Sequence, residues 1–292
     1  MTDALYRWVP PGLNEDEAEQ FLSVKKGIPD AARDTLTSWL TRGKEPSDFI
    51  STRSLTDFQT ASGIDLKIGH RAYLSVKELR VFYRALPEKT LTYLLDFSIS
   101  EYQVRPDGKF VPDRVTHLGR ILHTAGSGWG IGERQGRFAL ELRVPAGVLH
   151  TVDHVLSNQD KASSMLRSAW EKAYGVSPSP SDAYHDAVKA VEIVGAPLVS
   201  PNSDRATLGT IFRDLNDQES KGIWEFVMVG SKSTSALQHL ISTMKLLWHS
   251  QSDRHGSEDY KDVTVEEAQA AVLLASTLVG WLSQGALRRK TP

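Results

Sequence analysis

The chain has 292 residues, of which 40% are hydrophobic and 24% are charged, proportions that are ordinary for a globular protein. The formal net charge is −2, and residues 1–154 carry 20 basic and 20 acidic side chains, so no domain-wide basic surface is expected. The chain has no cysteine, which excludes disulfides and thiolate metal sites.

No stretch of the sequence predicts a membrane span or a signal peptide. The most apolar window, residues 268–282, includes Gln269 and Ser276 and falls short of the ~18 residues that a span needs. The amino terminus has no apolar run, and Pro10 and Pro11 interrupt it early. We therefore expect a cytoplasmic protein without a membrane partner.

The first half of the chain is expected to be mixed but mainly helical. Asn14 precedes an acidic turn, which is typical of the beginning of a helix. Apolar residues spaced three and four apart predict further helices. These are expected over residues 29–40, 75–84 and 89–98, and residues 114–124 are expected to be helical or mixed.

A change of pattern follows in residues 125–144. Residues 125–136 contain five glycines but no Gly-Lys-Ser/Thr, so they favour a hairpin or loop over a phosphate-binding loop. Alternating apolar residues over 137–144 predict a strand. We expect residues 1–150 to form a mixed domain of unknown role with a small sheet or hairpin.

The second half, residues 151–292, is expected to be a helical bundle. Its apolar periodicity and its proline breaks predict helices over residues 157–174, 181–194, 205–215, 233–251 and 264–282. The fold class is therefore α+β and mostly α. Between the last two helices we expect Trp248 to pack against a ridge of Leu273, Leu274 and Leu278.

The polar segment between those two helices, residues 250–262, has the strongest appearance of a site. It places Asp253, Arg254 and His255 in consecutive positions. A simpler explanation is that this segment only caps the preceding helix. Arg254 and His255 would favour the negative end of a helix, and Gly256 suits its left-handed cap position.

No metal site or cofactor is predicted. His150 and His154 are spaced to share one helix face, but the catalytic Glu of His-Glu-x-x-His is missing and no third ligand is evident. A surface or core pair of histidines is the preferred interpretation.

A homodimer through the second half is also expected. Residues 268–282 are apolar on almost all faces, and the small side chains of Ala270, Ala271 and Ala275 with Gly280 permit close approach of another helix. Burial against the first half of the chain is the competing explanation.

The order of several short motifs resembles a known family. These motifs are Ala169-Trp170, the segment Ala187 to Glu192, Pro201, Thr207-Leu208-Gly209, Leu247-Trp248 and Arg254-His255-Gly256. Over residues 157–287 this order resembles the C-terminal domain of abortive-infection proteins. That domain is placed among the HEPN-like helical folds, and the resemblance implies a role in antiviral defence.

The resemblance also implies a chemistry. Active HEPN members are metal-independent ribonucleases that present an Arg and a His at a dimer cleft. By that resemblance His255 is the acid/base and Arg254 the phosphate clamp, with RNA as the substrate. Orienting roles fall to Gln251, Asp253 and His249.

Two functions stay open because Arg254 is adjacent to His255, whereas active members separate the two by four to six residues. The first is a dimeric ribonuclease of abortive-infection type. The second is a catalytically silent HEPN-like module that dimerises and binds RNA or another ligand, since a fold by itself does not fix a chemistry.

Overall fold

The computed structural model describes residues 7–105, 110–144, 148, 152, 155, 160–203, 205–231, 234–249 and 262–290. The chain divides into two compact units, Met1–Arg143 and Val144–Pro292. The fold is α+β and mostly α, with small two-stranded antiparallel sheets, which confirms the predicted fold class.

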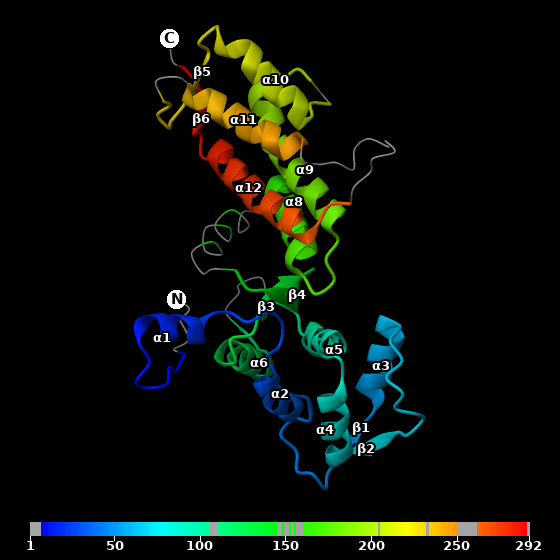
Figure 1. Ribbon diagram of the computed structural model, residues 1–292. Helices are drawn as coiled ribbons and strands as arrows, with labels where there is room; N and C mark the ends of the chain where they lie inside the picture. Colours follow the sequence, from blue (N-terminus) through cyan, green and yellow to red (C-terminus); the bar gives the residue numbers. More distant parts are fainter. Residues whose placement is uncertain are drawn as a thin grey trace. The chain divides into compact units, whose positions relative to one another are not determined.

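Unit 1, Met1–Arg143, is mainly helical (Figure 1). Its helices are α1 (Glu15–Leu22), the 3-10 turn η1 (Asp30–Ala32), α2 (Arg33–Leu40), α3 (Arg53–Ser62), α4 (Val76–Ala85), α5 (Glu88–Ser100) and α6 (Asp113–Thr124). Its strands are β1 (Phe49–Ser51), β2 (Tyr73–Ser75), β3 (Trp129–Arg134) and β4 (Arg137–Leu142).

Two helices of unit 1 begin with reciprocal side-chain caps. At α1 the Asn14 side chain accepts from the Glu17 backbone N–H, and the Glu17 carboxylate accepts from that of Asn14. Ser75 and Glu78 repeat this capping box at α4. Each box satisfies two backbone donors that a helix start leaves without partners, which explains why the Asn14 prediction is correct.

The glycine-rich stretch forms the β3–β4 hairpin, as predicted. Gln135 and Gly136 have φ values of 53° and 74°, so the turn between the strands uses two residues in the left-handed region. Ile131 pairs with Leu140 in the antiparallel register.

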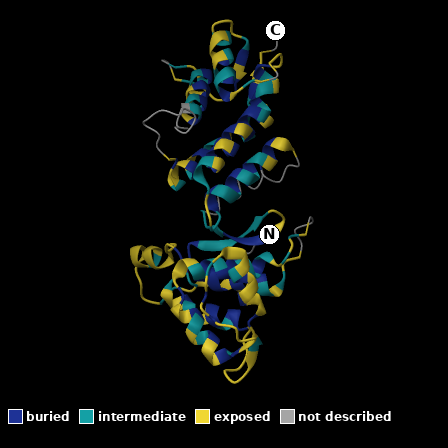
Figure 2. Cartoon of the chain, turned by 90° about the vertical axis from the view of Figure 1, so that its right-hand side faces the viewer, coloured by how far each residue is buried: buried dark blue, intermediate teal, exposed yellow. Residues whose placement is uncertain are grey.

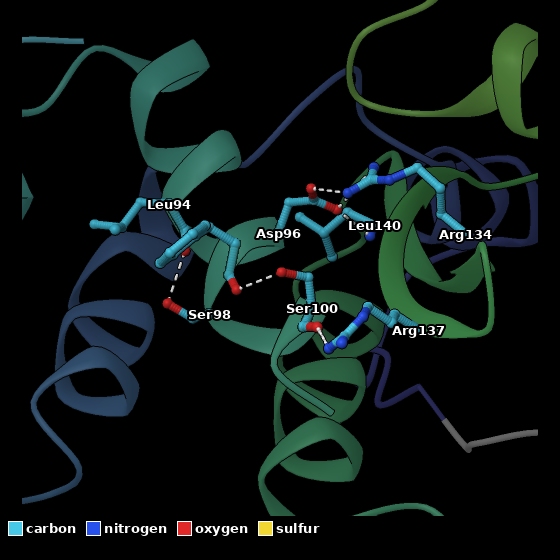
Figure 3. A network of polar contacts seen from close by, with 8 residues as sticks. Leu94, Asp96, Ser98, Ser100, Arg134, Arg137 and Leu140 are labelled. Carbon is cyan, nitrogen blue, oxygen red and sulfur yellow. Dashed lines mark hydrogen bonds and ion pairs between the residues drawn. The ribbon is translucent and has the colours of Figure 1, made fainter. Parts of the chain in front are cut away.

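Asp96 of α5 fixes this hairpin (Figure 3). Its carboxylate accepts from the Leu140 backbone N–H at 2.8 Å and from the Arg134 guanidinium at 2.6 Å. The Asp96 side chain is only 8% exposed, so the two donors compensate for the lost hydration of a buried charge.

Unit 2, Val144–Pro292, is a helical bundle (Figure 1). Its helices are α8 (Lys161–Tyr174), α9 (Pro180–Val199), α10 (Leu208–Glu219), α11 (Ala236–His249) and α12 (Val265–Ser283), and its strands are β5 (Trp224–Phe226) and β6 (Leu287–Arg289). The sequence did not predict β5 and β6, because strands of three residues carry too little periodicity to be detected.

Helix α9 lies at the centre of unit 2 and packs against α8, α10 and α12. Pro180 stands in its first turn, where a missing N–H costs nothing. Ten of its residues are buried, and Asp182, His185 and Lys189 form an exposed stripe along one face. Figure 2 shows buried residues running through the interior of each unit. The position of α9 explains its high content of alanine and valine.

Helix α12 is long and apolar enough to cross a membrane by length and composition, but 44% of its most apolar window is buried inside the bundle. Its buried residues are Ala268, Ala271, Val272, Ala275, Ser276, Leu278, Val279 and Leu282. The close approach that the small residues permit is therefore used in part by α9 of the same chain.

Candidate functional site

The predicted site residues Gln251, Asp253, Arg254 and His255 lie outside the described residues. His249 is the last residue of α11, and its side chain is also outside them. The structure does describe the helix ends on both sides of this segment.

The end of α11 is anchored to α9. The Tyr184 hydroxyl donates a 2.7 Å hydrogen bond to the Leu247 carbonyl, and both residues are buried. Leu247 carries one of the last four carbonyls of α11, which have no partner within the helix. Tyr184 therefore supplies a buried partner near the beginning of the site segment.

The beginning of α12 is anchored to α8. Thr264 and Glu267 form a capping box, and one turn later the Gln269 side chain donates to the Ala173 carbonyl at 3.1 Å. The Tyr174 hydroxyl reaches the Gln269 carbonyl at 3.5 Å, and burial raises the pKa of Tyr174 to about 12.

These two anchors lie on either side of the α8–α9 connection. Tyr174 is the last residue of α8, and Tyr184 lies in the first turns of α9. The end of α11 and the beginning of α12 are therefore both anchored near the α8–α9 connection.

Trp248 does not pack as predicted. Its ring contacts α10, where it meets Phe212 edge to face with a centroid distance of 6.4 Å. A Cβ atom added to Gly209 would lie 2.9 Å from Trp248 Cζ2, so the ring lies directly on the glycine backbone. The sequence predicted that Trp248 is buried together with Leu273, Leu274 and Leu278. Trp248, Leu273 and Leu274 are only half-buried, so that part of the prediction was wrong, whereas Leu278 is buried.

Two pairs of the motif residues behind the family resemblance contact each other. Buried Glu192 of α9 accepts from the Leu208 backbone N–H at 2.8 Å and thereby caps α10. The Trp248 ring lies against the backbone of the next residue, Gly209. These contacts hold the helices of the bundle together. Packing of the bundle therefore explains the described part of the motif pattern.

A second buried carboxylate of α9 also joins two helices. Asp186 accepts from the Ser168 hydroxyl at 2.7 Å and from the Lys172 ammonium at 2.5 Å, and both donors lie on α8. Asp186 is 7% exposed and satisfied on the α8 side. This cluster holds α8 and α9 in register.

A groove in unit 1 gathers basic side chains that the sequence reasoning missed. It lies between α2 and α6 and consists of two adjoining hollows of about 640 and 350 Å³, which share Thr35 and His117. The larger hollow is lined by Arg42, Tyr102 and Arg114 among others, and the smaller by Arg120.

One arginine of this groove is held rigidly. The Arg114 guanidinium lies 4.0 Å from the centre of the Trp39 ring and donates to the Trp39 carbonyl at 3.2 Å. The Trp39 indole in turn donates to the Arg114 carbonyl at 3.0 Å. Burial and the charge of Arg42 lower the pKa of Arg114, while Tyr102 and Glu101 oppose that shift.

The groove had a signal in the sequence. Arg114, His117 and Arg120 recur every three residues, which puts them along one side of α6. The sequence analysis missed this row because it considered only the net charge of residues 1–154. A net charge does not show where basic side chains cluster.

No metal site takes shape in the described part of the chain, where no three His, Asp or Glu side chains are grouped to hold an ion. His150 and His154, the pair considered from the sequence, lie outside the described residues.

Comparison with known proteins adds no assignment. No protein-family model, curated protein or solved structure matches the chain. The abortive-infection resemblance is therefore carried forward as a proposal.

Proposed function

We propose that this chain is an antiviral defence protein of abortive-infection type whose unit 2 acts on RNA as a HEPN-like module. The observation that carries the proposal is the anchoring of both ends of the segment between α11 and α12. Tyr184 holds the Leu247 carbonyl, and the Thr264 cap with Gln269 holds the beginning of α12. These anchors fix the two helix ends between which the proposed site residues lie in the sequence.

In this proposal the segment supplies a metal-independent ribonuclease site. The His255 imidazole takes the proton of a ribose 2′-hydroxyl and returns one to the leaving oxygen. The Arg254 guanidinium holds two phosphate oxygens. His249, Gln251 and Asp253 orient the substrate.

A specific observation supports the alternative, a catalytically silent HEPN-like module that binds RNA or another ligand. Glu192, Leu208, Gly209 and Trp248 all have packing roles, so the resemblance is explained by fold without chemistry. Arg254 is also adjacent to His255 instead of being separated from it.

Dimerisation through α12 is part of the proposal. Leu273 and Leu274 are half-buried and Ala270 is exposed, so one face of α12 is left without full cover by its own unit. A second copy could complete that cover. The proposed setting is the cytoplasm, without a membrane partner.

The test is cleavage of mixed-sequence RNA in the presence of EDTA by purified protein, with its mass measured by light scattering. We expect cleavage by a species of twice the 32.4 kDa chain mass, and loss of cleavage in His255→Ala and His255→Gln at unchanged melting temperature. Arg254→Lys should cut poorly, because an ammonium lacks the planar fork.

The alternative predicts RNA binding without cleavage in every variant. A chain that neither binds nor cuts RNA contradicts the nuclease and the RNA-binding form of the alternative, and a loss that only follows lost stability contradicts the site. In that case Arg254 and His255 only terminate a helix.

A further inference from the structure

We propose that the groove between α2 and α6 of unit 1 is a binding site for the phosphates of single-stranded RNA. The inference rests on unit 1 alone and does not require cleavage by the segment that contains His255. Its evidence is the arrangement of charge, shape and rigidity along the groove.

The groove is lined by an excess of basic side chains. Arg42, Arg114 and Arg120 line the two hollows, and none of them forms an ion pair with any residue that the structure describes. Asp113 is the one acidic residue among the described lining residues. An excess of guanidinium groups without an ion-pair partner in a hollow favours a bound anion.

The spacing of the basic side chains along α6 favours a ligand with several anionic groups in a row. Arg114 and Arg120 are six residues apart on α6, which is a distance of roughly 9 Å along the helix axis. His117 lies between them. A row of this length extends beyond one phosphate group, so successive phosphates of a polynucleotide fit it better than a single inorganic anion.

The groove is also prepared for a ligand. Arg114 is fixed on Trp39 before any ligand arrives, so little side-chain entropy is lost on binding. Arg42 has a φ of 57° because it is the left-handed cap residue at the end of α2. Its N–H donates to the Trp39 carbonyl, and the Gly43 N–H donates to the Ser38 carbonyl. This cap fixes the backbone that carries the Arg42 side chain.

Flat side chains favour RNA over an acidic protein segment. Tyr102 is half-buried and His117 is exposed, and both line the larger hollow. Each offers a ring on which an unpaired base can stack, which is how single strands are held without sequence preference. An acidic peptide has no group that requires such a surface.

The experiment measures binding of a fluorescent twelve-nucleotide RNA of mixed sequence to the full chain. All proteins carry His255→Ala, so that cleavage does not interfere. The test variant is Arg42→Gln/Arg120→Gln, because both side chains are exposed. The matched control is Arg53→Gln/Lys77→Gln, which removes the same charge from exposed positions of α3 and α4 outside the groove.

We expect the dissociation constant to rise at least tenfold in the groove variant and to change less than twofold in the control. If three phosphates are neutralised, log affinity should fall with log salt at a slope of about −2, and the groove variant should retain a slope of about −0.7. ATP and polyglutamate are tested as competitors.

Equal RNA binding by both double variants would overturn the proposal. So would polyglutamate or ATP that binds the groove in place of RNA. Cleavage is scored separately in proteins that keep His255. RNA binding that depends on the groove, with no cleavage, contradicts the nuclease and supports this site. Cleavage together with equal RNA binding by both double variants supports the nuclease and contradicts this site.

Discussion

Gly209 and Trp248 touch so closely that a Cβ on the glycine would lie 2.9 Å from Cζ2 of the indole ring. This contact joins α10 to α11, and Phe212 holds the ring from another side. The absence of a side chain at Gly209 therefore has a steric cause in the neighbouring helix.

Gly209→Ala should lower the free energy of unfolding by about 1–3 kcal/mol, because the added methyl group overpacks against the ring. Urea denaturation measures the change. In the Trp248→Ala background the same substitution should cost much less, which a double-mutant cycle detects. Gly280→Ala is the control, since its Cβ would lie at an ordinary 3.5 Å from Val155. Additive losses would contradict the contact.

Tyr184→Phe should lower the free energy of unfolding by about 1–3 kcal/mol, because it leaves the buried Leu247 carbonyl without its donor. Amide exchange should accelerate in the last turn of α11. Tyr174→Phe is the matched control and should cost less, because its hydroxyl lies 3.5 Å from the Gln269 carbonyl. Equal losses in the two variants would remove the anchoring argument.

Asp96→Asn should lower the free energy of unfolding by about 1.5–3 kcal/mol, because it leaves the Arg134 guanidinium without its charged partner. Asp57→Asn on the exposed surface of α3 is the control and should stay within about 0.5 kcal/mol of the parent. Chemical denaturation compares the two. A loss no larger than that of the control would show that the β3–β4 hairpin does not depend on this ion pair.

Glu78 should titrate well below its ordinary range. The Ser75 hydroxyl, then the Arg71 guanidinium, then the Ser75 backbone N–H lower the pKa of Glu78 from 4.5 to about 2. A carboxyl with a lowered pKa in the folded chain stabilises it fully above pH 4.5, and that contribution is lost as the pH falls toward 2. Ser75→Ala should raise this pKa more than Arg71→Gln does, as measured by NMR titration. The opposite order would contradict the capping geometry.

The sequence alone determined the local structure. Asn14 marked a helix start because its side chain satisfies a backbone donor three residues away, a contact that needs no distant partner. The glycine-rich stretch predicted a hairpin for the same reason, since Gly136 occupies a left-handed turn position within that stretch. Periodicity likewise predicted the helices of unit 2.

Only the tertiary structure decided which helix each apolar face meets. Trp248 contacts Gly209 and Phe212 of α10, and its helical spacing in the sequence did not identify that partner. The groove was hidden for a related reason. Arg42 and Arg114 are far apart in the chain and line one hollow only because α2 and α6 lie side by side. A sequence pattern reports interactions between residues a few positions apart. Packing and electrostatic interactions depend on residues that are distant in sequence and are brought together by folding.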